Sequence, residues 1–182
     1  TDELVLFGSA DGYVYCLSAD DGALVWRYRA APQRRQMMAR SQLESPWPVH
    51  GSVLLRDGKA YCTAGRQRYL DGGILLLVLD VETGQLVSQT ILDETDNATG
   101  EDLHASAKGL SMPVALTDIL SANENYMFMH EQAFDFQGVP VPVEALQGKE
   151  EELLHLFTPT GFLDDSWFHR TYWLYGSQFQ SG

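Results

Sequence analysis

Short apolar runs alternate with turn signals from the first residues of the chain onward. Three such runs, separated by Asp11-Gly12 and Asp20-Asp21-Gly22, cover residues 4–10, 13–18 and 23–29. Asp and Gly tolerate the positive φ that tight hairpins need, so both motifs predict reversals of the chain. No helical period of 3.6 residues persists for more than a turn or two. The pattern predicts a β-meander over about residues 3–30.

The same pattern returns further along the chain. Residues 59–65 match residues 3–9, and residues 77–87 match residues 15–25, with an insertion of six residues around positions 66–71. A further strand predicted at 51–56 gives this second unit four strands. Four short antiparallel strands, repeated every ~40–60 residues, are typical of a propeller blade.

A third, more divergent unit follows, with strands predicted at 125–130, 152–157 and 167–175 and a turn at 158–161. We therefore predict an all-β fold of β-propeller blades, each a four-stranded antiparallel meander, in one partial propeller domain over residues 1–182. The blade-like units are placed at about 3–30, 50–92 and 114–176. The long segments 31–48 and 92–113 are interpreted as functional loops or crossovers.

Residues 8–26, GSADGYVYCLSADDGALVW, resemble the repeat of pyrroloquinoline-quinone-type (quinone-binding-like) β-propeller proteins of bacteria. Residues 79–87 are a second, partial copy, with Ser88 where the first copy has Trp26. The large flat ring of Trp26 is expected to wedge between neighbouring blades. Closed propellers have about 4–8 blades, so we expect a fragment with open sheet edges. The expected partners are a protein, the remaining blades or a second copy of the chain, in a periplasmic or secreted location implied by the resemblance alone.

Charge and cysteine content narrow the function classes. The chain has 12 Lys and Arg against 25 Asp and Glu, a net charge of −13, which argues against binding nucleic acid or anionic lipid. Its longest apolar run, at 74–79, is far shorter than the ~18 residues of a membrane span. The catalytic quinoproteins that the repeat resembles carry two adjacent cysteines against the quinone and an Asp beside bound calcium. Cys16 and Cys62 lie far apart, so no cofactor is predicted, and pyrroloquinoline quinone or calcium are minor alternatives. Both cysteines are expected in the core.

Arginine is concentrated between positions 27 and 40 and in the insertion, a local positive cluster in an acidic chain. Guanidinium groups suit carboxylate and phosphate ligands, so we predict a binding face for an anionic ligand or a protein. Its residues are Arg34, Arg35, Arg40, Glu44, Trp47, His50, Arg66, Arg68 and Tyr69. The alternative is that the arginines pair internally with Glu44, Asp71 and other carboxylates. Trp47 and Tyr69 lie on predicted loops and are expected to be exceptions to core packing.

Two further clusters could carry chemistry. The acidic loop at 93–102 offers oxygen ligands for calcium, with Asp93, Asp96, Glu101 and Asp102 as candidates. It lacks the spacing of a calcium-binding motif, so the alternative is a solvated loop. Asp164, Asp165, His169 and Arg170 are candidate catalytic or metal-binding residues, and the alternative is a hydrogen-bonded corner.

The sequence thus favours a non-catalytic propeller binding or scaffold module of the quinone-binding-like repeat family. The alternative function is part of an extracytoplasmic enzyme with an Asp/His/Arg site at the propeller mouth. A quinoprotein oxidoreductase is disfavoured by the missing cysteine pair.

Overall fold

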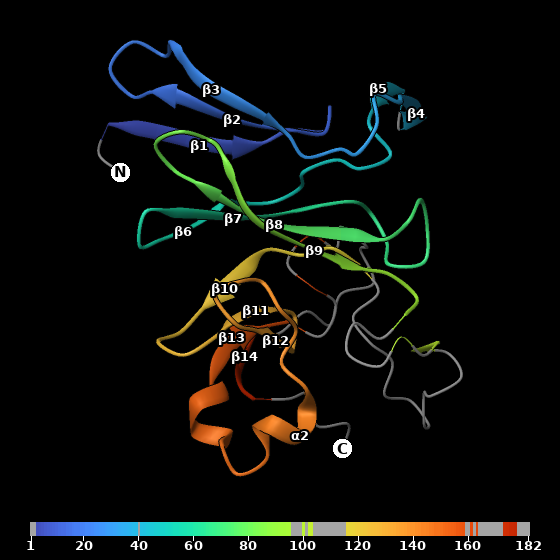
Figure 1. Ribbon diagram of the computed structural model, residues 1–182, viewed down its shortest axis with the longest axis vertical. Coiled ribbons are helices and arrows are strands. Elements are labelled where there is room, and N and C mark those ends of the chain that lie inside the picture. Colours follow the sequence, from blue (N-terminus) through green and yellow to red (C-terminus); the bar gives the residue numbers. More distant parts are fainter. Residues whose placement is uncertain are drawn as a thin grey trace.

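The strands of the protein form antiparallel sheets that follow one another through the molecule (Figure 1). The computed structural model describes residues 3–39, 41–95, 100, 102–103, 116–158, 161, 163 and 173–177. Over these residues no helix combines the length and the apolar character needed to cross a membrane. The succession of sheets is a partial β-propeller of about three blades.

The first blade is a three-stranded meander in the order β1-β2-β3. Its strands are β1 (Leu4–Gly8), β2 (Tyr13–Ser18) and β3 (Leu24–Arg29). The predicted Asp11-Gly12 reversal forms, with Gly12 at φ 86° and the Tyr13 amide donating to Asp11 Oδ1 at 3.1 Å. In the part of the chain that is described, no strand pairs with the outer edge of β1.

The second blade is the four-stranded sheet expected from the sequence, in the order β6-β7-β8-β9. Its strands are β6 (Leu54–Arg56), β7 (Lys59–Ala64), β8 (Ile74–Asp80) and β9 (Leu86–Leu92). Asp57 at φ 50° and Gly58 at φ 70° form the two-residue turn between β6 and β7. Both central residues of such a hairpin turn need positive φ, which explains why this Asp-Gly pair ends β6.

The first and second blades share details of backbone geometry as well as a sequence pattern. The pairing of β2 with β3 shifts register between Cys16 and Leu17, and the pairing of β8 with β9 shifts between Val78 and Leu79. The turn glycines correspond as well, because Gly22 and Gly84 have φ of 71° and 68°. Each donates its amide over 2.9 Å to the carbonyl of the residue that ends the preceding strand, Ser18 or Asp80. The two blades therefore share one design.

The register corrects one detail of the predicted repeat. Leu4 pairs with Ser18 in the first blade, and Lys59 pairs with Asp80 in the second. Because Ser18 and Asp80 correspond, Leu4 corresponds to Lys59, so residues 4–8 match 59–63 rather than 60–64. A shift of one residue moves every side chain of a strand to the other face, so the correction changes which residues of β1 are equivalent to which residues of β7. The insertion before β8 is therefore one residue longer than predicted.

The third unit departs further from the expected pattern. Its strands are β10 (Leu120–Ala122), β11 (Met127–Met129) and β12 (Gln132–Phe134) in one sheet and β13 (His155–Phe157) and β14 (Leu174–Gly176) in another. The predicted strand at 152–157 is shorter because Glu150–Leu153 forms the 3₁₀ helix η1. A short helix, α2 (Val143–Leu146), precedes it.

The segment at 31–48, predicted as irregular, contains a hairpin. Its strands are β4 (Met37–Ala39) and β5 (Gln42–Glu44), and Ser41 at φ 65° lies in the turn. The chain then runs inward, and residues 45–49 are all buried. Most of the other long segment, 92–113, lies outside the described residues.

The core explains the longest apolar run of the sequence. Strand β8 has both faces buried: Leu75, Leu77 and Leu79 pack between the first and second blades, whereas Ile74, Leu76 and Val78 pack toward the third unit. A strand with one solvated face would alternate apolar and polar residues, and a strand covered on both faces does not. The second blade is therefore the central layer of the stack.

Trp26 joins the first two blades, as its position in the repeat predicts. Its indole Nε1–H donates to the carbonyl of Val81 at 2.8 Å, across the gap between β3 and the turn after β8. The ring lies over Gly84, where a Cβ atom would approach Trp26 Cδ2 to 2.5 Å. The absence of a side chain at Gly84 thus makes room for the indole. In the second blade Ser88 takes the corresponding position, and its hydroxyl donates to the carbonyl of Gln137 at 2.7 Å.

Both cysteines lie in the core, as expected. Burial raises the pKa of the Cys62 thiol to about 12, and it raises that of Cys16 as well. Because the thiolate is the reactive form, we expect neither residue to react with a thiol reagent such as DTNB at pH 8 while the protein is folded. The measurement is thiol titration with and without denaturant. Rapid labelling of Cys62 in the native protein would contradict its buried position.

Candidate functional site

The structure brings part of the predicted anion-binding face together, but through internal ion pairs. Arg35 Nη1 lies 3.3 Å from Asp71 Oδ1, and Arg66 pairs with Glu44, whose side chain is only 12% exposed. These contacts tie the segment of the β4–β5 hairpin to the loop between β7 and β8. The alternative of internal pairing is therefore confirmed for Arg35 and Arg66. The Arg66 Nε atom is buried and has no hydrogen-bond partner in the described part of the chain.

Trp47 corrects the expectation that it lies outside the core. Its side chain is 5% exposed and packs between the first and second blades. The indole Nε1–H donates to the carbonyl of Asp71 at 2.8 Å, so its polar atom is satisfied inside the protein. A buried and hydrogen-bonded indole holds the Asp71 loop in place and offers no ring face to a ligand.

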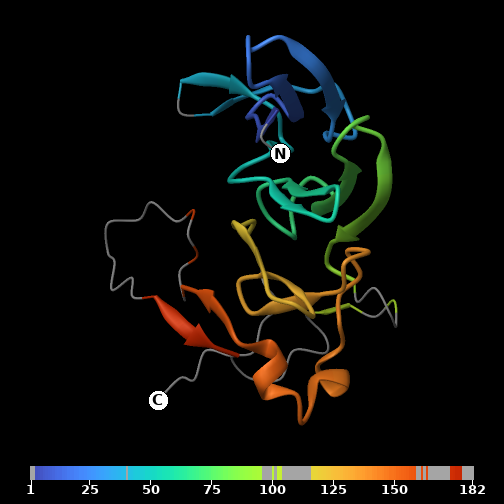
Figure 2. The ribbon, with the colours of Figure 1, turned by 90° about the vertical axis from the view of Figure 1, so that its left-hand side faces the viewer.

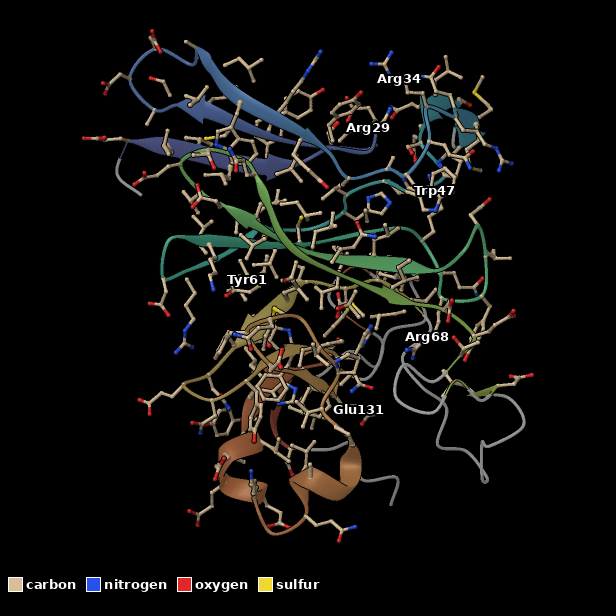
Figure 3. The ribbon with its side chains drawn as sticks, viewed as in Figure 1. Arg29, Arg34, Trp47, Tyr61, Arg68 and Glu131 are labelled. Carbon is tan, nitrogen blue, oxygen red and sulfur yellow. The ribbon has the colours of Figure 1, made fainter. Side chains whose placement is uncertain are left out.

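The remaining residues of the predicted face do not form one cluster. Arg34 is exposed, whereas Arg68 is buried and donates from Nε to the carbonyl of Asp93 at 2.8 Å. Figure 3 shows Arg34 and Arg68 well apart, with Trp47 between them in that view. His50 and Tyr69 are half-buried. Arg40 lies outside the described residues, and binding of an anion at Arg34 stays a prediction.

The acidic loop is organised at its start by a local hydrogen-bonded turn. Asp93 Oδ1 accepts from the backbone amide of Thr95 at 2.9 Å and from its hydroxyl at 2.6 Å. The Thr95 hydroxyl, with smaller contributions from the backbone and Arg68, lowers the pKa of Asp93. Asp102 bridges back to Thr95. The candidates Asp96 and Glu101 lie outside the described residues, so the calcium hypothesis stays a prediction.

Replacing Thr95 by valine should raise the pKa of Asp93, because the hydroxyl that stabilises its carboxylate is removed. A lowered carboxyl pKa stabilises the fold above the pKa of the unfolded chain, and this contribution disappears as the pH falls through the folded pKa. The variant should therefore lose stability near neutral pH and differ less from the parent in acid. Carbon-13 NMR titration of Asp93 measures the pKa. An unchanged titration curve would contradict the assigned cause.

The candidate catalytic cluster falls in a part of the chain that the structure does not describe. Asp164, Asp165, His169 and Arg170 all lie outside the described residues. Among the residues that are described, no group of three or more His, Cys, Asp or Glu side chains is positioned to hold a metal ion. The enzyme alternative and the candidate metal sites therefore stay predictions.

One surface that the sequence analysis missed is the outward face of the first blade. It carries Val5 and Phe7 from β1, Tyr13 and Tyr15 from β2, and Arg27 and Arg29 from β3, and we call these six residues the head face. Phe7 and Tyr15 stack with ring centroids 5.4 Å apart, and the Arg27 guanidinium lies 5.6 Å from the Tyr13 ring centroid. The Tyr15 hydroxyl donates to Asp11 at 2.6 Å, which raises the pKa of Tyr15. Val5 and Phe7 are nevertheless 49% and 41% exposed.

The corrected register shows what this face corresponds to in the second blade. Val5 and Phe7 correspond to Ala60 and Cys62, and Tyr13 and Tyr15 correspond to Leu75 and Leu77. All four residues of the second blade are buried in the core between the two blades. The apolar and aromatic part of the head face therefore occupies the position of a blade-to-blade interface, and in the described structure no blade covers it.

The first blade has a site equivalent to the one at which the second blade binds Trp26. Trp26 binds at Val81 and Gly84, and the equivalent positions are Ala19, which is exposed, and Gly22. A Cβ atom at Gly22 would meet no atom within 4 Å, in contrast to the crowded Gly84. We call the Ala19 carbonyl and Gly22 the indole socket.

The sequence contained a signal for this face. In a strand with one solvated side, outward positions are usually polar, yet Val5, Phe7, Tyr13 and Tyr15 are apolar or aromatic at outward positions. The repeat alignment did not reveal the signal, because its shift of one residue matched Val5 and Phe7 with Tyr61 and Thr63 instead of Ala60 and Cys62.

Comparison with known proteins assigns no family to the chain. No protein-family model matches the chain, and no curated protein matches it. Among solved structures, the chain resembles BamB from Moraxella catarrhalis, with a TM-score of 0.41 and 18% sequence identity. The match covers 78% of this chain and 47% of the BamB chain, so the protein spans less than half of that structure. The assignment as a β-propeller repeat protein rests on the blades themselves.

Proposed function

We propose that the chain is a non-catalytic propeller section that acts as a scaffold by binding a further blade-like sheet on its head face. The observation that carries the proposal is the internal equivalence of the blades. In the second blade, the positions equivalent to Val5, Phe7, Tyr13 and Tyr15 are buried by the first blade. In the first blade no blade covers these residues in the described structure, and the indole socket is open. A sheet with a tryptophan at the position of Trp26 would complete both features.

The chemistry of the head face supports a protein partner. Aromatic rings and arginines together are typical of the residues that contribute most to protein interfaces. Phe7, Tyr13 and Tyr15 form a preassembled aromatic surface, and Arg27 and Arg29 add positive charge to an acidic protein. An interface of this kind needs no cofactor. The separate positions of Cys16 and Cys62 on two different blades support a function without bound quinone.

We also propose a repeat family and a location for the chain. The motif at residues 8–26 supports membership in the quinone-binding-like repeat family of bacteria. A location in the periplasm or outside the cell follows from that family resemblance.

The indole socket can be tested with a small probe. N-acetyl-tryptophanamide, added to nitrogen-15-labelled protein, should shift the amide signals of Gly22 and its neighbours in a saturable manner. Gly22→Asn is the blocking variant, because Asn tolerates the positive φ of Gly22 while its side chain fills the socket. The shifts should disappear in this variant. If the Gly22 signal does not respond to the probe, or responds equally in Gly22→Asn, the proposed function is wrong.

A further inference from the structure

The end of the molecule opposite the head face also presents an apolar sheet surface. In β13 and β14, Leu156 pairs with Tyr175, and the neighbours of Leu156, His155 and Phe157, are buried. Leu156 and Tyr175 therefore share the outward face. Trp173 lies directly before β14, two residues before Tyr175. Trp173 and Tyr175 are 68% and 73% exposed.

Negative charge directly precedes this sheet along the chain. The 3₁₀ helix η1 ends just before β13 and carries Glu150, Glu151 and Glu152, all of them exposed. Lys149 is the neighbouring positive charge, and it contacts the hydroxyl of Tyr126 at 3.3 Å. We call Leu156, Trp173, Tyr175 and the three glutamates of η1 the tail face.

The two faces lie at opposite ends of the stack of sheets. Figure 2 shows the first blade at the top of the view and β13 and β14 toward the bottom, with the second blade and the β10–β12 sheet between them. Figure 1 gives the same order from another side. One chain therefore cannot bring its own faces together in this conformation, but two chains can.

We propose that the partner of the head face is the tail face of a second copy of this chain. The inference rests on the proposed function and names its partner. The first blade offers the aromatic rings and two arginines of the head face, with Phe7 exposed and Tyr13 and Tyr15 half-buried, and the open indole socket. The tail face offers an exposed tryptophan, a tyrosine and three glutamates. Trp173 of one copy would enter the socket formed by Ala19 and Gly22 of the other, and η1 would face Arg27 and Arg29.

The contact is heterologous, because different surfaces meet at each junction. Such a contact closes into a ring if the rotation between copies allows it and otherwise continues as an open chain. Two partial propellers of about three blades each would together reach the blade number of closed propellers, about 4–8. The charge pattern also disfavours the symmetric alternatives, since head-to-head contact opposes arginines and tail-to-tail contact opposes glutamates.

The expected result is reversible self-association of the full chain, measured by sedimentation velocity and light scattering over a wide concentration range. Trp173→Ala should weaken it about tenfold or more, as expected for an aromatic residue at the centre of an interface. Leu43→Ala is the matched control, because Leu43 is similarly exposed but lies on β5, outside both faces. The control should associate like the parent.

Charge reversal tests the pairing of the faces. Arg27→Glu/Arg29→Glu and Glu151→Arg/Glu152→Arg should each weaken self-association, and an equimolar mixture of the two variants should restore it, because each altered face then meets its opposite charge. Failure of the mixture to recover would overturn the proposed pairing. A chain that stays monomeric at every concentration would overturn the second copy as partner, even if the Gly22 signal still responds to the tryptophan probe. The response of Gly22 to the probe tests the proposed function alone. Failure of the proposed function can therefore be distinguished from failure of the second copy as partner.

Discussion

Replacing Trp26 by alanine should lower the free energy of unfolding by about 3 kcal/mol. Removing a packed tryptophan typically costs about 3–5 kcal/mol, and Trp26 is half-buried, so the lower end applies. Part of the loss, about 1 kcal/mol, comes from the hydrogen bond to the Val81 carbonyl. The rest comes from the gap over Gly84, which has no side chain to fill it. Urea denaturation followed by circular dichroism measures the change.

Two further variants separate the contribution of the hydrogen bond from that of the packed ring. Trp26→Phe retains a ring over Gly84 but has no donor for the Val81 carbonyl, so it should cost about 1 kcal/mol. Val25→Ala changes the adjacent and exposed residue on the same strand, and it should stay within about 0.5 kcal/mol of the parent. Equal effects of Trp26→Ala and Val25→Ala would mean that the indole does not join the blades.

The turns and strands of the first two blades could be predicted from the sequence because their causes are local. An Asp-Gly pair such as Asp57-Gly58 between two strand-like runs is a strong signal for a tight reversal, and the run at 74–79 predicts a buried strand. The third unit was harder, because its pattern is set by contacts between distant residues. Asn123 Nδ2, for example, donates to the carbonyl of Glu152 at 2.7 Å, and no sequence pattern indicates this contact.

The candidate site could likewise be predicted only in part from the sequence. The sequence named the carboxylates that pair with two of the arginines, Asp71 for Arg35 and Glu44 for Arg66, but it could not distinguish an open anion site from internal ion pairs. The distinction depends on the loop at 66–73, which brings Asp71 beside both Arg35 and Trp47. The Arg35–Asp71 pair is exposed and contributes little stability, whereas Glu44 of the second pair is largely buried. We interpret the two pairs as positioning the segment of the β4–β5 hairpin.

The head face was missed for a reason that concerns repeats in general. Aligning repeats by residue similarity matched Val5 with Tyr61, whereas the hydrogen-bond register matches Val5 with Ala60. A one-residue shift moves every side chain of a strand to the other face. Cross-strand pairing is therefore the safer guide to equivalent positions in blades, and it alone shows that Phe7 corresponds to a residue buried between blades.

Leu76→Ala and Leu77→Ala should each lower the free energy of unfolding by about 3 kcal/mol, although they are adjacent in one strand. In a sheet with one solvated face only one of them would matter, but Leu76 packs toward the third unit and Leu77 toward the first blade. Leu86→Ala, on β9 and exposed, is the control and should change stability by less than about 0.5 kcal/mol. Hydrogen exchange should then rise in β10–β12 for Leu76→Ala and in β1–β3 for Leu77→Ala. If either leucine behaves like Leu86, that face of the second blade is not covered, and the stack of blades on which both proposals depend does not form in solution.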